Sequence, residues 1–172
     1  MNIIKEMYGS DDLNINGRKL KREAVRGVIK KGEKFLLVYS RENKDYKFPG
    51  GGIKRGEDHR TALRRELKEE VGAIMTENID SIGKIIQYNK PIEHDFDVFH
   101  MDSYYYSCSV EDELEEQDLD EYEAILGFEP RWVTLKEAIE QNERVLANEY
   151  GKIPRWTKRE TYMLKWISEN ME

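Results

Sequence analysis

Three glutamates, Glu66, Glu69 and Glu70, are spaced as neighbours on one side of a predicted helix. Side chains three and four positions apart point the same way when each residue turns the helix by about 100°. Like charges at these spacings cost about 0.2–0.5 kcal/mol per pair in an isolated helix, so such a face usually has a cation to offset it. Carboxylate oxygens suit hard ions such as Mg²⁺ or Mn²⁺ rather than zinc. The spacing therefore predicts a magnesium or manganese site.

The rest of this helix fits a position between core and solvent. Leu63, Leu67 and Val71 recur at the helical period and predict a buried stripe. Gly72 follows them and is typical of a helix C-terminus. The alternative is a solvated helix with ion pairs such as Arg65 with Glu69, because charged helix faces are common.

A glycine-rich turn precedes the helix. Gly50, Gly51 and Gly52 allow the backbone to approach a ligand closely, and a backbone of this kind before a helix can face a metal–phosphate assembly. Gly56 allows a second sharp turn before the helix begins near residues 57–58. A glycine triplet alone is more often an ordinary loop. It indicates a ligand site here because an acidic helix follows it.

Together these residues resemble the Nudix box of the Nudix hydrolases. The positions that match in register are Gly51, Glu57, Arg65, Glu66, Leu67, Glu69, Glu70 and Gly72. Ala73 is smaller than the aliphatic residue that usually closes the box. The flanking residues 46–49 and 131–138 also look like the family, the latter like its last strand and following helix.

The resemblance implies an α/β fold, a Nudix-type α/β/α sandwich with a mixed β-sheet between helices. It also implies a divalent-metal-dependent hydrolase that uses water to cleave a pyrophosphate bond in a nucleoside diphosphate linked to another moiety. Nucleoside triphosphates, oxidised dGTP, dinucleoside polyphosphates and ADP-ribose all belong to this substrate class. The expected cofactor is Mg²⁺ or Mn²⁺, and the expected partner is a small-molecule nucleotide.

The family's site residues carry over to matching positions of this chain. Glu69 and Glu70 are the first metal ligands implied, and Glu66 is a further ligand or the general base. Glu57 assists from the start of the helix, and Arg65 orients the glutamates. The backbone carbonyl of Gly50 or Gly51 is a further candidate ligand.

The general base can also come from a later loop in this family. Nine of the thirteen residues from 111 to 123 are acidic. Such a run is usually a solvated, mobile loop. The functional alternative places one of its carboxylates over the metal, with the candidates Glu113, Glu115, Glu116 and Glu121.

Substrate-binding residues are harder to identify from the sequence. Lys47 is the nearest cation to the glycines, and one or two of the basic residues in 18–26 should reach a polyphosphate. A nucleobase usually needs an aromatic platform. Tyr46, Phe48 and Tyr88 are candidates, although each could instead pack in the core.

The 172 residues predict one domain, with 1–20 as an N-terminal arm or edge strand and 155–170 as a C-terminal helix. Strands are expected at 24–29, 34–39, 82–87, 96–110 and 127–133, and a further helix near 135–147. The apolar stripe of the last helix fits either the core or a dimer surface, so the chain is expected to be a monomer or a homodimer.

Composition limits the partners and the cellular compartment that we expect. The net charge of −7 argues against duplex nucleic acid as a partner, and we find neither an apolar run of membrane-spanning length nor a signal peptide. The single Cys108 fits a reducing cytoplasm.

Two other function classes share the expected fold. One is a non-catalytic nucleotide-sensing Nudix module, which typically lacks some of the glutamates present here. The other is an isoprenoid diphosphate isomerase, which needs catalytic cysteine and histidine ligands that have no matching motif around Cys108.

Overall fold

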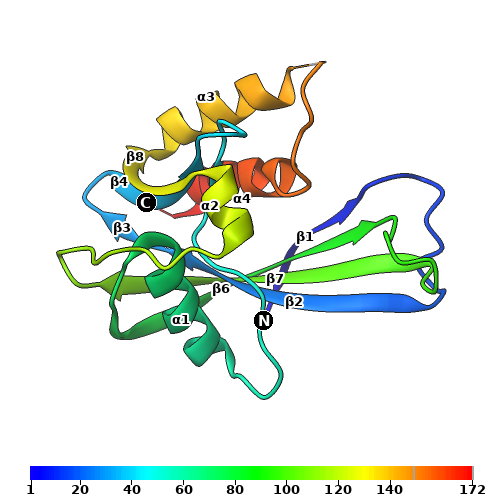
Figure 1. The fold of residues 1–172 in the computed structure, drawn as a ribbon, viewed down its shortest axis with the longest axis horizontal. Helices are drawn as coiled ribbons and strands as arrows, with labels where there is room; N and C mark the ends of the chain where they lie inside the picture. The colour runs from blue at the N-terminus through cyan, green and yellow to red at the C-terminus, as the bar shows by residue number, and fades with distance from the viewer. Residues whose placement is uncertain (149, 172) are drawn as a thin grey trace.

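The computed structural model describes residues 1–148 and 150–171, and it places two β-sheets between helices (Figure 1). The strands are β1 (Ile3–Tyr8), β2 (Lys19–Val28), β3 (Lys30–Lys31), β4 (Lys34–Ser40), β5 (Tyr46–Lys47), β6 (Met75–Asn89), β7 (Val98–Val110) and β8 (Phe128–Thr134). The helices are α1 (His59–Val71), α2 (Glu121–Leu126), α3 (Leu135–Leu146) and α4 (Thr157–Asn170).

The larger sheet is mixed. Its strand order is β1-β6-β7-β2, with β6 and β7 antiparallel, β1 parallel to β6, and β2 parallel to β7. In the smaller sheet β4 pairs with β3, β5 and β8, all antiparallel. One end of the larger sheet extends away from the helices (Figure 1). The predicted mixed α/β fold is confirmed.

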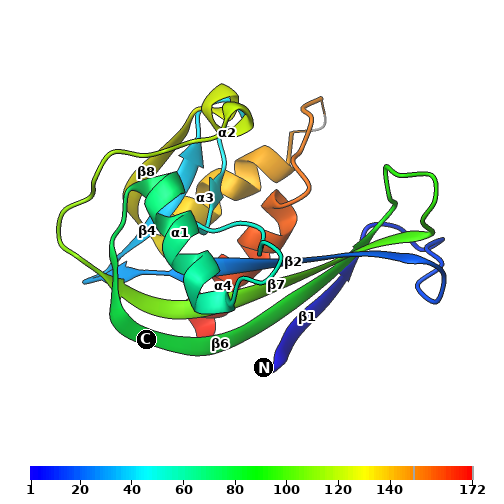
Figure 2. The same cartoon turned by 60° about the horizontal axis from the view of Figure 1, so that its bottom comes forward.

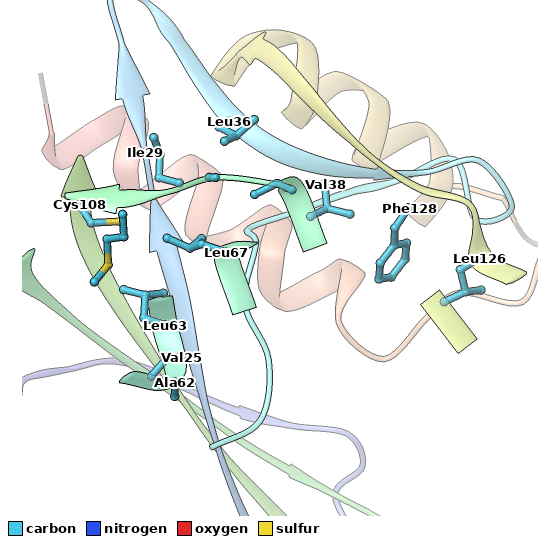
Figure 3. Close-up of a cluster of buried hydrophobic side chains, with 13 residues drawn as sticks. Val25, Ile29, Leu36, Val38, Ala62, Leu63, Leu67, Cys108, Leu126 and Phe128 are labelled. Carbon is cyan, nitrogen blue, oxygen red and sulfur yellow. The ribbon is translucent and has the colours of Figure 1, made fainter. Parts of the chain in front are cut away.

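Strand β4 shows how the two faces are filled. Successive side chains of a strand point to opposite faces. Leu36 and Val38 belong to a cluster that includes the α1 residues Leu63 and Leu67, and Figure 3 shows these side chains converging. Phe35 and Leu37 belong instead to a second cluster that includes residues of α3 and α4. Helix α1 therefore covers one face of the fold and α3 with α4 the other, as Figure 2 shows.

The elements differ from the sequence predictions mainly in length. Strand β6 begins at Met75 rather than near residue 82, because it pairs with β7 as far as that strand's last residue, Val110, across two register shifts. Helix α2 was not predicted. The apolar stripe of α4 is core, since Met163 and Ile167 are fully buried in the second cluster. Among the described residues, no helix has the length and apolar character needed to cross a membrane.

Candidate functional site

Helix α1 is fixed at both ends by its own sequence. The Asp58 side chain accepts a hydrogen bond of 2.7 Å from the backbone of Thr61, which caps the first turn. Gly72 ends the helix in the left-handed conformation, with φ of 67°. The predicted stripe of Leu63, Leu67 and Val71 is fully buried. Glu66 and Glu70 lie on the side of the helix next to this stripe, are also buried, and face the glycine segment.

The glycine segment, residues 49–53, lies along β2 like an additional strand. Backbone hydrogen bonds run from Gly27 to the Pro49 carbonyl at 2.8 Å and from Val25 to the Gly51 carbonyl at 3.0 Å. Carbonyls alternate in direction along an extended chain. The Gly51 carbonyl therefore faces β2, whereas the Gly50 carbonyl accepts side-chain hydrogen bonds from Arg26 and Lys47. Of the two carbonyls predicted as ligands, that of Gly50 is available to the site.

Three carboxylates converge next to this segment. One oxygen each from Glu66, Glu70 and Glu123 lies within 4.8 Å of the others. At this separation each pair of charges repels by on the order of 3 kcal/mol at an effective dielectric constant of about 20. Burial raises the pKa of Glu66, and burial with the nearby Glu70 raises the pKa of Glu123 to about 7. The cluster therefore needs positive charge to stay ionised.

Arg65 provides part of that charge and fixes the positions of the acids. Its guanidinium donates two hydrogen bonds of 2.8 Å to Glu57, one of 2.6 Å to Glu66 and one of 3.2 Å to Glu69. A further bond of 3.0 Å reaches the Gly52 carbonyl. The hydrogen bonds from Arg65 lower the pKa of Glu57 to about 2. Arg65 thus contacts three of the glutamates named in the sequence analysis.

Lys47 provides a second cation at the centre of the cluster. Its Nζ lies 2.6 Å from Oε1 of Glu70, 3.4 Å from the Gly50 carbonyl oxygen and 4.8 Å from the centre of the Phe128 ring. The other oxygen of Glu70 accepts a 2.9 Å hydrogen bond from the Gly50 backbone. Glu70 is only 2% exposed, so both of its oxygens are satisfied within the protein.

The chemistry of these groups fits a hard divalent ion. The acidic side chains gathered here are Glu57, Glu66, Glu69, Glu70 and Glu123, and the basic ones are Arg26, Lys47 and Arg65. Five carboxylates facing three cations leave two negative charges when all are ionised. Carboxylate and carbonyl oxygens are the ligands that Mg²⁺ and Mn²⁺ prefer.

A large cavity opens beside the carboxylates. It has a volume of about 1240 Å³ and includes Glu70, Glu123 and Gly50 in its wall. Basic side chains dominate the rest of its charged lining: Arg26, Lys44, Lys47, Arg144, Lys152, Arg155 and Arg159. Three exposed apolar residues, Ile92, Tyr122 and Ile153, also line it. The cavity thus combines an acidic corner with a cationic wall and apolar surface.

A buried ion pair on α4 holds Phe48, the residue that precedes the glycine segment. Glu160 is fully buried, pairs with Arg159 at 2.7 Å and accepts a 2.8 Å hydrogen bond from the backbone of Phe48. Arg159 in turn donates a 2.6 Å hydrogen bond to Gln87 on β6. The chain that leads into the glycines is therefore tied to both the last helix and the larger sheet.

The structure brings together only some of the predicted site residues. Glu66, Glu70, Arg65, Glu57, Gly50 and Lys47 meet at one place, as described above. Glu69 lies on the same helix, but its contact is with Arg65 rather than with the three-carboxylate cluster. Among the basic residues in 18–26, Arg26 lines the cavity.

The three aromatic candidates do not line the cavity. Phe48 is fully buried and packs edge-on against Tyr105, with ring centres 5.7 Å apart. Tyr46 is buried against Tyr39, and Tyr88 stacks on Tyr8 at 5.1 Å. These rings therefore lie in packing positions. The cavity residues Tyr122 and Ile153 were not predicted.

The acidic run does reach the carboxylate cluster, but through a residue outside the four candidates. The residue is Glu123, at the start of α2. Asp120 and Glu123 exchange hydrogen bonds of 3.0 and 2.8 Å, which form a capping box. This Asp-x-x-Glu spacing is the sequence signal that could have located the helix and its acid.

The acidic run is also tied to the end of α1. The backbone of Glu115 donates a 2.7 Å hydrogen bond to the Gly72 carbonyl, and that of Asp118 donates one of 2.8 Å to the Glu69 carbonyl. The Gln117 side chain donates to the carbonyls of Glu70 and Phe128. These donors satisfy carbonyls that a helix leaves unpaired at its C-terminus, so the run has a defined path over the helix.

Comparison with known proteins finds a family model and relatives that match this chain. A family model described as the NUDIX domain matches residues 20–157. An RNA pyrophosphohydrolase of Nitratiruptor sp. is 40% identical over 62 residues, which cover 36% of this chain and 40% of that protein. An RNA pyrophosphohydrolase of Campylobacter jejuni subsp. doylei is 24% identical over 139 residues, covering 74% of this chain and 84% of the relative.

Solved structures show the same fold. The MutT protein of Bacillus halodurans aligns with a TM-score of 0.59 at 16% identity, covering 84% of this chain and 80% of the other. A NUDIX hydrolase of Nitrosomonas europaea aligns with a TM-score of 0.53 at 18% identity, covering 83% and 89%. At such identities the likeness concerns the fold alone.

Proposed function

The chain belongs to the NUDIX family of pyrophosphohydrolases, and from this premise we propose that it is a divalent-metal-dependent hydrolase of nucleoside diphosphate derivatives. The proposal rests above all on the carboxylate cluster of Glu66, Glu70 and Glu123 at one corner of a cation-lined cavity. The acids suit the ion, and the cationic wall suits the phosphates of the substrate.

We assign different roles to the residues of the cluster. Glu66, Glu70 and the Gly50 carbonyl would hold Mg²⁺ or Mn²⁺, with Glu57, Glu69 and Arg65 keeping the acids in place. The bound ion neutralises phosphate charge and lowers the pKa of an attacking water. Arg65 lies 2.6 Å from Glu66, and this charge-assisted contact keeps the carboxylate in position as a ligand.

We assign the general base to Glu123. Among the described residues it forms no ion pair, whereas Glu66 and Glu70 pair with Arg65 and Lys47. A carboxylate without a cationic partner is the better proton acceptor. Glu123 comes from α2, a different element from Glu66 and Glu70 on α1, so the base would be held independently of the ligands.

The cavity favours a substrate larger than a mononucleotide. Its volume of about 1240 Å³ exceeds the roughly 300–1,000 Å³ of most small-molecule pockets. Its seven basic side chains suit several phosphate groups, and Tyr122 offers an exposed ring for a base. Two relatives named RNA pyrophosphohydrolase point the same way. We therefore place the triphosphorylated 5′ end of RNA beside the mononucleotide and dinucleotide substrates of this class.

The test is product release from a panel with Mg²⁺ or Mn²⁺. The panel contains a nucleoside triphosphate, oxidised dGTP, diadenosine tetraphosphate, ADP-ribose and a short 5′-triphosphorylated RNA. Glu70→Gln should lower kcat/KM by at least about 100-fold. Glu113→Gln makes the same chemical change on an exposed residue of the acidic run and should leave it unchanged.

Removing the metal with a chelator should stop hydrolysis, and adding metal back should restore it. Turnover that survives chelation, or an equal rate in Glu70→Gln, would contradict the proposal. Binding of the panel compounds without any hydrolysis would instead indicate a nucleotide-sensing module.

A further inference from the structure

Lys47 lies where a ligand of the carboxylate cluster would have to bind. Its Nζ is 2.6 Å from Oε1 of Glu70 and 3.4 Å from the Gly50 carbonyl oxygen. These are two of the oxygens that the proposed function assigns to the divalent ion. The lysine side chain is 9% exposed and the Glu70 side chain 2%, so the ammonium is held close to a buried acid.

Two of the three basic side chains at the cluster, Arg65 and Lys47, are held very differently. Arg65 donates to two oxygens of Glu57, to Glu66, to Glu69 and to the Gly52 carbonyl, and this network fixes its position. The contacts recorded for Lys47 are the two oxygens above and the face of the Phe128 ring. Lys47 also lines the cavity, so its long side chain can turn toward water.

Electrostatic repulsion disfavours binding of the divalent ion while Lys47 remains at Glu70. Arg26 also donates to the Gly50 carbonyl, so that oxygen already faces two basic side chains. A divalent ion on Glu70 and Gly50 would meet the Lys47 ammonium at close range, where like charges repel strongly. Among the described residues, Lys47 is the basic side chain that pairs with Glu70, whereas Arg26 donates to the Gly50 carbonyl alone. An ion bound to Glu70 would therefore displace Lys47 first.

We propose that Lys47 and the divalent ion compete for Oε1 of Glu70 and the Gly50 carbonyl. Lys47 keeps the acids ordered before loading and turns into the cavity when the ion is bound. There its ammonium joins Arg26 and Arg159 on the cationic wall, facing the phosphates of the substrate. The inference rests on the metal site of the proposed function and adds a role for Lys47 in loading it.

Competition has a measurable size. If Lys47 leaves Glu70 in about 10% of molecules without metal, the apparent affinity for the ion is reduced about tenfold. Lys47→Met removes the ammonium and keeps the length of the side chain. It should raise the affinity for Mn²⁺ about tenfold, measured by calorimetry or by electron paramagnetic resonance with Mn²⁺ alone. Lys152→Met changes the same charge in the same cavity, away from Glu70, and should change the affinity about twofold or less.

A second measurement uses the unaltered protein and does not depend on how the variant folds. Lysines are labelled with an amine-reactive reagent, with and without saturating Mn²⁺, and quantified by mass spectrometry. Labelling of Lys47 should rise about tenfold with Mn²⁺ and follow the binding curve. Labelling of Lys152 should stay constant.

The outcomes separate this inference from the proposed function. Mn²⁺ binding by the unaltered protein, with Lys47 labelling unchanged, overturns the competition and leaves the metal site standing. An affinity in folded Lys47→Met that equals or falls below that of the unaltered protein does the same. Absence of any Mn²⁺ binding by the unaltered protein overturns both.

Discussion

The glycine segment offers a test in which neighbouring positions should respond to alanine in different ways. Gly51→Ala is the informative change. An added Cβ would lie 2.6 Å from Cδ of Glu66 and 2.8 Å from its Oε1. The backbone of Gly51 is not in the left-handed region, so alanine is tolerated there without strain. The methyl group therefore acts on the Glu66 carboxylate and not on the fold.

The size of the effect follows from these distances. Ordinary contacts of a Cβ begin near 3.4 Å, so the Glu66 carboxylate must retreat by roughly 1 Å. A displacement of this size at a reacting centre costs about 100-fold in rate, or about 2.7 kcal/mol of activation free energy. The free energy of unfolding should change by less than about 1 kcal/mol, since replacing glycine also restricts the unfolded chain.

The adjacent glycines are matched controls. Within the described part of the chain, and apart from the two neighbours of Gly52 in sequence, no atom lies within 4 Å of a Cβ on this residue, so Gly52→Ala should keep both rate and stability. Gly50 has φ of 142°, and its Cβ would clash with the Val25 carbonyl and lie 2.9 Å from Cα of Arg26. Gly50→Ala should therefore cost on the order of 4 kcal/mol of stability.

The assay pairs kcat/KM on the best panel substrate with urea unfolding of each variant. Among these three glycines, we expect a loss of rate without loss of stability only at Gly51. If Gly51→Ala retains full activity, or if it unfolds as readily as Gly50→Ala, the assigned geometry around Glu66 is wrong.

Two further predictions concern buried and paired carboxylates. Glu160→Gln removes the charge that Arg159 needs in the interior, so unfolding should become easier by about 3–5 kcal/mol in urea titrations; a loss below about 1 kcal/mol would contradict the buried pair. Arg65 lowers the pKa of Glu57 from 4.5 to about 2, so this stabilisation is complete above pH 4.5 and disappears as pH falls toward 2. Glu57→Gln should therefore destabilise the protein more near pH 7 than near pH 2, and equal losses at both pH values would refute that coupling.

Local patterns predicted α1 and its surroundings well. The buried stripe, the stop at Gly72 and the convergence of Glu66 with Glu70 all depend on residues close together in the chain. Helical periodicity and glycine chemistry act at that range. The family resemblance adds the sheet, which the structural neighbours confirm.

The residues that escaped prediction depend on contacts between distant segments. Glu123 reaches the cluster because the acidic run is hydrogen-bonded to the end of α1. The composition of the run does not distinguish which of its acidic residues reaches the site. The face on which Tyr88 lies depends on strand register, since a shift of one residue reverses it. The position of Phe48 depends on its contacts with Tyr105 and Glu160, which are distant in the chain. Tyr122 lines the cavity because it lies in the first turn of α2, a helix that was not predicted.

The attachment of the acidic run to the C-terminus of α1 has a consequence for the effect of salt. A helix C-terminus carries partial negative charge, and here it receives a segment rich in carboxylates. Salt screens the repulsion between the helix end and these carboxylates, with a Debye length of about 10 Å at 0.1 M. Added salt should therefore stabilise the position of Glu123 at the cluster. The same ions weaken the attraction between the cationic wall and phosphates. Ionic strength thus acts in opposite directions on the two halves of the site, and turnover should be fastest at an intermediate salt concentration.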